Sequence, residues 1–155
     1  VWTIQLVQHP IVLGIAGHNY LILRDNKNNI HKELHGLATN NETGEWKYRG
    51  NNKKDLLKVW EFDDTRYLTA QKDYTGVILF TGTEFEAKDK WEKSYPCKDA
   101  INEKKISYPP YGVKLGGETE NSNSVAYTLL TCMNLPSRYL GLFIPGWGKD
   151  LLNDN

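Results

Sequence analysis

The sequence has little cysteine, no net charge and no long hydrophobic run, and each shortage excludes a class of protein. Nineteen basic residues balance nineteen acidic ones, so no overall positive field attracts nucleic acid or an anionic membrane surface. The longest apolar run, Ile11 to Ala16, is far shorter than the roughly 20 residues that a membrane-spanning helix needs. We therefore expect neither a nucleic-acid partner nor a membrane span.

Cysteine is represented only by Cys97 and Cys132. Two thiols are compatible with one disulfide, but a domain of this size does not depend on a covalent cross-link. Cys132 lies in an apolar segment, which is typical of a free thiol buried as a small hydrophobic side chain. Cys97 lacks local neighbours that would activate a nucleophilic thiol. We expect Cys132 to be a buried thiol, and the sequence leaves the redox state of the pair open.

Several catalytic and targeting motifs are missing as well. There is no Gly-x-Ser-x-Gly elbow, no phosphate-binding glycine-rich loop, no Cys-x-x-Cys and no His-Glu-x-x-His. No internal period recurs, which excludes repeat architectures. A basic start followed by an apolar run, the mark of a signal peptide, is not visible. Val1 in place of Met is compatible with a processed chain, an excised domain or an exported part of a larger effector.

The first half of the chain has the pattern of β-structure. Its alternating and continuous apolar segments, separated by polar turns, predict five to seven strands. The polar segment from Asp25 to Asn29 predicts a hairpin turn, since Asn and Asp tolerate left-handed backbone. We expect strands at Trp2–Val7, Ile11–Ala16, Tyr20–Leu23, Ile30–His35, around Trp46 and Tyr48, Leu56–Phe62 and Val77–Phe80.

The second half predicts helices. Thr83 and Glu86 form the pattern of a capping box, and Pro96 ends or restarts the helix that they begin. The polar run 121–124 predicts the start of a second helix, which Asn134 and Pro136 stop. Five Trp, nine Tyr and four Phe supply a core for a chain of 155 residues. We therefore expect a single α+β domain over residues 1–155, in which an antiparallel sheet from the N-terminal half packs against helices from the C-terminal half.

His18 is the first candidate functional residue. It lies beside Gly17 at a strand boundary, and a continuous strand would place it on one face with Tyr20 and Ile22. Histidine is the side chain most easily poised as a general base near neutral pH.

The alternating residues His31, Glu33 and His35 are the second candidate group. A period of two places them on one face of a strand, where three interpretations stay open. They form an exposed sheet face, or they bind a divalent metal ion, or one of them orients the imidazole of His18. We favour His35 over His31 for the last role, with Glu33 as its substitute, because Gly36 ends the strand there.

The run Asn121-Ser122-Asn123-Ser124 is the third candidate. Four capping-type residues exceed what one helix cap needs. Hydroxyl groups in a first helical turn also lie near unpaired N–H groups and the positive end of the helix dipole, which stabilise an oxyanion in acyl transfer. A serine nucleophile needs a base nearby in space, and His18 is the obvious one.

These motifs resemble the circularly permuted papain-like superfamily, in particular its lecithin:retinol acyltransferase-like and PPPDE peptidase branches. That superfamily carries a His early and a nucleophile late, in an Asn-Cys-x-His-Phe type segment that opens a helix. By this resemblance Asn121 matches the Asn, Ser122 the Cys and His18 the early His, with His31 or His35 as the second polar residue. The chain also resembles a bacterial family with the segments Glu-Leu-His-Gly-Leu-Ala, Asn-Ser-Asn-Ser and Pro-Gly-Trp-Gly-x-Asp-Leu-Leu, found here at 33–38, 121–124 and 145–152.

The resemblance implies a permuted papain-like hydrolase of an amide or ester bond that needs no cofactor. It implies Ser122 as nucleophile, His18 as base and His35 as orienting residue. Asn121 or Asn123 would assist the backbone N–H groups of an oxyanion hole, and Ser124 is the reserve nucleophile. The implied substrate is a peptide, a cell-wall peptide or an acyl compound, and a toxin role would imply an immunity or carrier protein as partner.

Ser122 departs from the family because it stands where the thiol is expected, and serine is far less acidic than cysteine, whose pKa is about 8.5. Two alternatives therefore stay open beside a serine hydrolase. The domain is a non-catalytic papain-like binding module of a phage or secretion system, or it is a metal protein that uses His31, Glu33 and His35.

Overall fold

The structure is a computed structural model that describes residues 1–11, 16–47, 50, 53–63, 75–109, 121–138, 140 and 146–153. The strands are β1 (Trp2–Ile11), β2 (Ala16–Arg24), β3 (Ile30–Thr39), β4 (Trp46–Lys47), β5 (Leu56–Phe62), β6 (Thr75–Gly82) and β7 (Ile106–Ser107). The helices are α1 (Glu84–Glu92), α2 (Tyr95–Glu103) and α3 (Ser122–Cys132).

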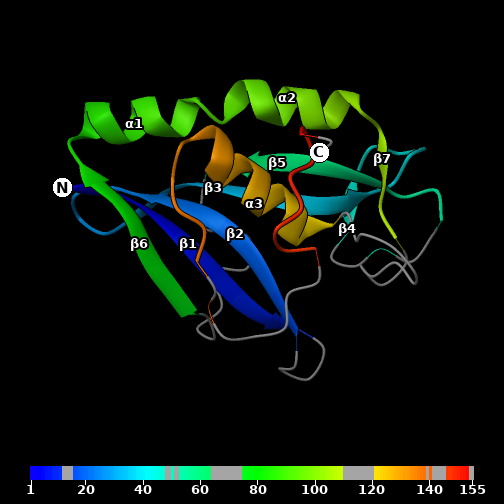
Figure 1. Cartoon of the computed structure of the whole chain (residues 1–155), viewed down its shortest axis with the longest axis horizontal. Coiled ribbons are helices and arrows are strands. Elements are labelled where there is room, and N and C mark those ends of the chain that lie inside the picture. Colours follow the sequence, from blue (N-terminus) through cyan, green and yellow to red (C-terminus); the bar gives the residue numbers. More distant parts are fainter. Residues whose placement is uncertain are drawn as a thin grey trace.

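The seven strands form one antiparallel sheet in the order β6-β1-β2-β3-β5-β7, and β4 pairs with β3 beside this path. Figure 1 shows α1 and α2 end to end along the sheet and α3 across it. The predicted α+β class with an antiparallel sheet is therefore confirmed. The short strand β7 was not predicted, because two residues carry no readable period. Of the two residues predicted to form a strand after the polar loop, Trp46 lies in β4 and Tyr48 lies outside the described residues.

The apolar run from Ile11 to Ala16 is not one strand, so that prediction was wrong. Ile11 ends β1, Ala16 begins β2, and the two residues face each other as antiparallel partners. Residues 12–15 lie outside the described residues. The prediction failed because one buried strand and a reversal between two buried strands can have the same apolar composition.

Local turn and cap chemistry follows the sequence closely. Asp25 Oδ1 accepts hydrogen bonds from the backbone N–H groups of Lys27 and Asn29, both at 2.9 Å, and Asn28 has a φ of 65°. These are the features of the predicted hairpin turn between β2 and β3.

The helices also begin and end where the sequence indicates. Thr83 and Glu86 form the predicted capping box of α1, and Pro96 restarts the chain in α2. Asn134, with a φ of 55°, follows the end of α3. In the described part of the chain, no helix has the length and apolar character to cross a membrane.

The three helices cover one face of the sheet. Trp91 of α1, Ile101 of α2 and Leu129 of α3 belong to the main core, together with sheet residues such as Leu21 and Leu34. A second, smaller cluster lies on the opposite face, formed by Val7, Tyr20, Ile22 and Leu37. We call these the helix face and the opposite face of the sheet.

Cys97 and Cys132 form a disulfide that joins α2 to the end of α3. The prediction of a free buried thiol at Cys132 was therefore wrong. The apolar sequence around Cys132 reflects its place on a packed helix, and nothing in that sequence shows that Cys97 approaches it from another helix.

Candidate functional site

β2 and β3 pair over only part of their length, and the start of α3 lies where they separate. The last pair of their ladder joins Leu21 to Leu34. Beyond it, the buried backbone N–H of Asn19 donates to Asn123 Oδ1 of α3 at 2.8 Å. Because a buried N–H without a partner is costly, this bond fixes the start of α3 against β2. We call this place the β2–β3 opening.

Gly36 lets α3 approach β3 at the same opening. A Cβ atom at this position would lie 2.5 Å from Val125 Cβ and 3.0 Å from Ser122 Cα. Only a residue without a side chain fits so close to the first turn of the helix. The glycine that follows His35 therefore positions Ser122.

Asn121 and Ser124 are used by the helix cap. Asn121 Oδ1 accepts from the N–H groups of Asn123 (2.9 Å) and Ser124 (3.3 Å), and Ser124 Oγ accepts from the N–H of Asn121 at 3.2 Å. The Ser124 hydroxyl donates to the carbonyl of Gly146 at 3.0 Å and is fully buried. These bonds explain both residues structurally and leave the Ser124 hydroxyl no path to a ligand.

The Ser122 hydroxyl lies at the first helical position and is paired with Tyr108. The two hydroxyl oxygens are 3.3 Å apart. Burial raises the pKa of Tyr108, and the hydrogen bond with Ser122 opposes that rise. Tyr108 is therefore a neutral phenol at physiological pH, able to donate to Ser122 or to accept from it.

His18 and His35 form a hydrogen-bonded pair of imidazoles across the β2–β3 opening. His18 Nε2 lies 3.0 Å from His35 Nδ1. On its other side, His35 Nε2 lies 3.9 Å from Glu33 Oε2. A carboxylate at this distance favours a proton on His35 Nε2, and in that tautomer His18 Nε2 would donate to His35 Nδ1. His18 Nδ1 would then be the unprotonated nitrogen of its ring.

Both imidazoles are neutral at physiological pH. Burial lowers the pKa of His18 well below its ordinary value, and repulsion from a protonated His35 or His9 would lower it further. Burial also lowers the pKa of His35. The rings stack with Tyr20, whose ring centroid is 4.2 Å from that of His35 and 5.4 Å from that of His18.

The predicted pairing of Ser122 with His18 is not formed in the described structure. The imidazoles project on the opposite face with Tyr20, whereas Ser122 reaches the opening from the helix face, where Gly36 and Val125 meet. The Ser122 hydroxyl is bound to Tyr108 and the His18 Nε2 atom to His35. The two groups thus approach one opening from its two sides.

Exposure divides these four polar residues into two that keep slight contact with solvent and two that are fully buried. Ser122 retains 6% exposure and His18 retains 7%, whereas His35 and Glu33 are 0% exposed. The interpretation of 31–35 as an exposed sheet face was therefore wrong for Glu33 and His35. A sequence period of two cannot tell a solvated face from a second buried one.

The alternative metal site is not assembled. His31 packs edge-on against Trp2, with ring centroids 5.0 Å apart, and the facing nitrogens of His18 and His35 are bonded to each other. Across the described ranges, no three His, Cys, Asp or Glu side chains form a group that could hold a metal ion.

The chain matches no protein-family model, and no curated protein or solved structure is significantly similar to it.

Three residues of the site were missed by sequence reasoning. Tyr108 and His9 lie outside every strand and helix that the sequence predicts, and Tyr20 is predicted only to share a face with His18. His9 faces His18 in the β1–β2 ladder, and Tyr108 follows β7. A strand register that placed Ile11 opposite Ala16 would have found His9, but nothing in the sequence brings Tyr108 to Ser122.

Proposed function

We propose that the chain is a circularly permuted papain-like domain that hydrolyses an amide or ester bond by acyl transfer. Ser122 is the nucleophile and His18 the general base. The observation that carries the proposal is the 3.0 Å hydrogen bond between His18 and His35, placed where the start of α3 enters the β2–β3 opening. The chain order, an early His, a second His on the next strand and a late helix start, is the order that the permuted family uses.

His35 orients the base. Its Nδ1 atom holds the His18 ring through Nε2, and Glu33 lies behind it. With the ring held in this tautomer, His18 Nδ1 is the nitrogen that accepts the serine proton. The lowered pKa of His18 keeps that nitrogen unprotonated at neutral pH.

The first turn of α3 supplies the oxyanion donor. Asn121 Oδ1 already accepts from the N–H groups of Asn123 and Ser124. Within the described residues, the N–H of Ser122 has no such partner. It therefore faces a developing oxyanion at the positive end of the helix. Asn123 Oδ1 accepts from the backbone N–H of Asn19, which leaves only its Nδ2 group as a donor of the kind that an oxyanion needs.

Catalysis requires the Ser122 hydroxyl to turn from Tyr108 toward His18. Rotation about χ1 releases Oγ from Tyr108, and because the two groups approach the opening from opposite faces, the start of α3 must also shift for Oγ to reach His18. Ser122 Oγ then attacks the carbonyl carbon while its proton passes to His18 Nδ1. His18 returns that proton to the leaving amine or alcohol, and water releases the acyl group by the reverse sequence.

A peptide, cell-wall peptide or acyl ester is the substrate class that we propose, by analogy with the fold class rather than from a contact.

A non-catalytic papain-like binding module is the second candidate function. The Ser122–Tyr108 hydrogen bond favours it, because this bond holds the hydroxyl on the side of the opening away from the imidazoles.

Replacing Ser122 by cysteine tests the spatial claim without a known substrate. Both native cysteines are in the disulfide, so the S122C variant would carry a single free thiol. We expect its alkylation rate by iodoacetamide to rise with pH through a thiol pKa below the ordinary value of about 8.5, because a neighbouring imidazole stabilises the thiolate. In the S122C/H18Q variant, the thiol pKa obtained from the alkylation profile should return to about 8.5. Identical alkylation profiles in the two variants would show that residue 122 and His18 do not meet in the β2–β3 opening.

A fluorophosphonate probe then separates the hydrolase from the binding module. We expect labelling of the native chain that is lost in Ser122→Ala and retained in Ser137→Ala, which removes an exposed serine. A shifted thiol profile without any labelling of the native chain would favour the binding module.

A further inference from the structure

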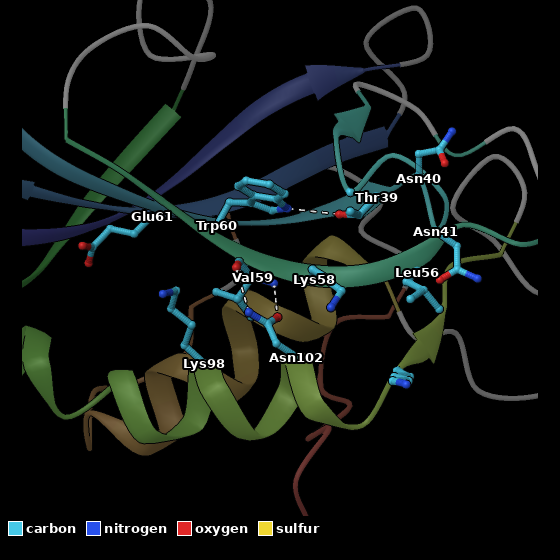
Figure 2. Close-up of a pocket in the computed structure, with 12 residues that line it drawn as sticks. Thr39, Asn40, Asn41, Leu56, Lys58, Val59, Trp60, Glu61, Lys98 and Asn102 are labelled. Atoms are coloured by element: carbon cyan, nitrogen blue, oxygen red, sulfur yellow. Dashed lines mark hydrogen bonds between the residues drawn. The ribbon is translucent and has the colours of Figure 1, made fainter.

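A hollow lies beside β5, the strand that pairs with β3. It has a volume of about 580 Å³ and lies between β5, the turn that follows β3, and α2. Figure 2 shows Lys98 and Asn102 extending from α2 toward β5, with Lys58 on the strand itself. Small-molecule sites have volumes of about 300–1,000 Å³, so this hollow has the size of a ligand site.

Positive charge dominates this hollow. Lys58, Lys98 and Lys105 line it, and we call it the lysine pocket. Within the described residues, none of the three ammonium groups takes part in a salt bridge or a side-chain hydrogen bond. Three uncompensated cations at one hollow are notable in a chain whose net charge is +0.

Among the described residues that line the pocket, the one acidic side chain does not neutralise it. Glu61 Oε2 accepts from Trp91 Nε1 at 2.9 Å, and Glu61 Oε1 lies 3.4 Å from Lys32 Nζ. Lys32 lies outside the set that lines the pocket. The Glu61 carboxylate is therefore paired with Lys32, which does not line the pocket. The positive charge of the three pocket lysines is not neutralised by it.

Asn102 blocks the addition of a peptide strand to β5, which favours a small molecule as the occupant of the pocket. Its Oδ1 accepts from the N–H of Val59 at 2.7 Å, and its Nδ2 donates to the carbonyl of Val59 at 3.2 Å. The side chain thus occupies the two groups that an added peptide strand would use at the centre of the β5 edge. The neighbouring position toward the N-terminus, Leu57, is paired with Ile106 of β7.

We propose that the lysine pocket binds a small polyanion, a ligand that carries several phosphate or carboxylate groups. Lysine ammonium groups bind such oxygens as point charges, and the three lysines come from β5, from α2 and from the turn after α2. The amide side chains of Asn40 and Asn41 line the same space and add neutral hydrogen-bonding groups. This site is independent of the proposed hydrolase site.

Isothermal titration with inorganic tripolyphosphate and with citrate, at low ionic strength, tests the proposal on the full chain. We expect saturable binding of at least one of the two, weakened at least about tenfold in the K58A/K98A/K105A variant because charge-assisted contacts dominate. A charge-matched control, K27A/K88A/K93A, removes three lysines that do not line the pocket and should bind as the native chain does.

The two titrants also identify the source of the anionic groups. Binding of tripolyphosphate alone indicates phosphorylated ligands, and binding of citrate alone indicates carboxylates. Binding of neither titrant would overturn the proposal, as would an equal loss of affinity in the control variant, which would show a nonspecific charge effect. Circular dichroism of each variant confirms that the fold is retained.

Discussion

His18 and His35 show at the scale of single residues how burial sets charge. Both rings are packed against Tyr20, and burial lowers the pKa of each well below its ordinary value. In the unfolded chain these imidazoles would take up protons near pH 6.5, whereas in the folded chain they stay neutral to lower pH.

The first prediction concerns the pH dependence of stability. The free energy of unfolding should be unaffected by this pair above about pH 6.5 and should fall below it, by about 1.4 kcal/mol per pH unit for each imidazole, because the unfolded chain binds protons that the folded chain excludes. Urea unfolding between about pH 6.5 and 5 measures the slope.

A double replacement provides the control. His18→Gln/His35→Gln should flatten this slope, because the two imidazoles that the folded chain keeps neutral are then absent. An unaltered slope in the double variant would show that other groups cause the loss of stability in acid.

At the scale of elements, the contact between β3 and α3 depends on Gly36. A methyl group there would meet Val125 Cβ at 2.5 Å and the backbone of Ser122 at 3.0 Å, and neither can move without shifting the helix. The same close approach brings the start of α3 to the opening where Asn19 binds Asn123.

The second prediction follows from this contact. Gly36→Ala should reduce the free energy of unfolding by about 1–3 kcal/mol, the range for overpacked sites. Gly76→Ala is the matched control on β6, since its nearest atom beyond the chain neighbours would lie 3.6 Å away. We expect the control to change stability by less than about 1 kcal/mol. Equal effects of the two changes, in chemical denaturation, would contradict the packing argument.

At the scale of the whole molecule, the disulfide restricts the unfolded chain. Cys97 and Cys132 are 35 residues apart, and the bond ties α2 to the far end of the helix whose start forms the candidate site. Closing a loop of that length removes chain entropy from the unfolded state in proportion to the logarithm of its length.

The third prediction is that Cys97→Ser/Cys132→Ser lowers the free energy of unfolding by about 3–4 kcal/mol, the entropy expected for this loop. The native chain reduced with dithiothreitol should unfold at the same denaturant concentration as the double variant. A variant as stable as the oxidised native chain would show that the bond adds no net stability.

Much of the local structure could be predicted from the sequence. The Asp25–Asn29 turn, the cap at Thr83 and the start of α3 at Asn121 depend on side chains that bind backbone within a few residues, so short segments contain the information. The α+β class and most strands followed from apolar periodicity. The prediction of one strand at Ile11–Ala16 failed because the composition of a segment does not show where the chain reverses direction.

The candidate site was only partly predictable. Residue type alone marked His18, His35 and Ser122, but their relations depend on pairing between distant segments. The hydrogen bond of His18 to His35 requires the register of β2 and β3, and the capture of Ser122 by Tyr108 requires the path of the chain after β7.

The sequence by itself determined the turns, the caps, the apolar faces and the supply of chemical groups, because each depends on interactions between near neighbours. Only the tertiary structure decided which groups meet. It joined Cys97 to Cys132, closed the β5 edge with Asn102 and buried Glu33 on a second packed face. These outcomes depend on contacts between segments that are far apart in the chain, and no local pattern of residues encodes such contacts.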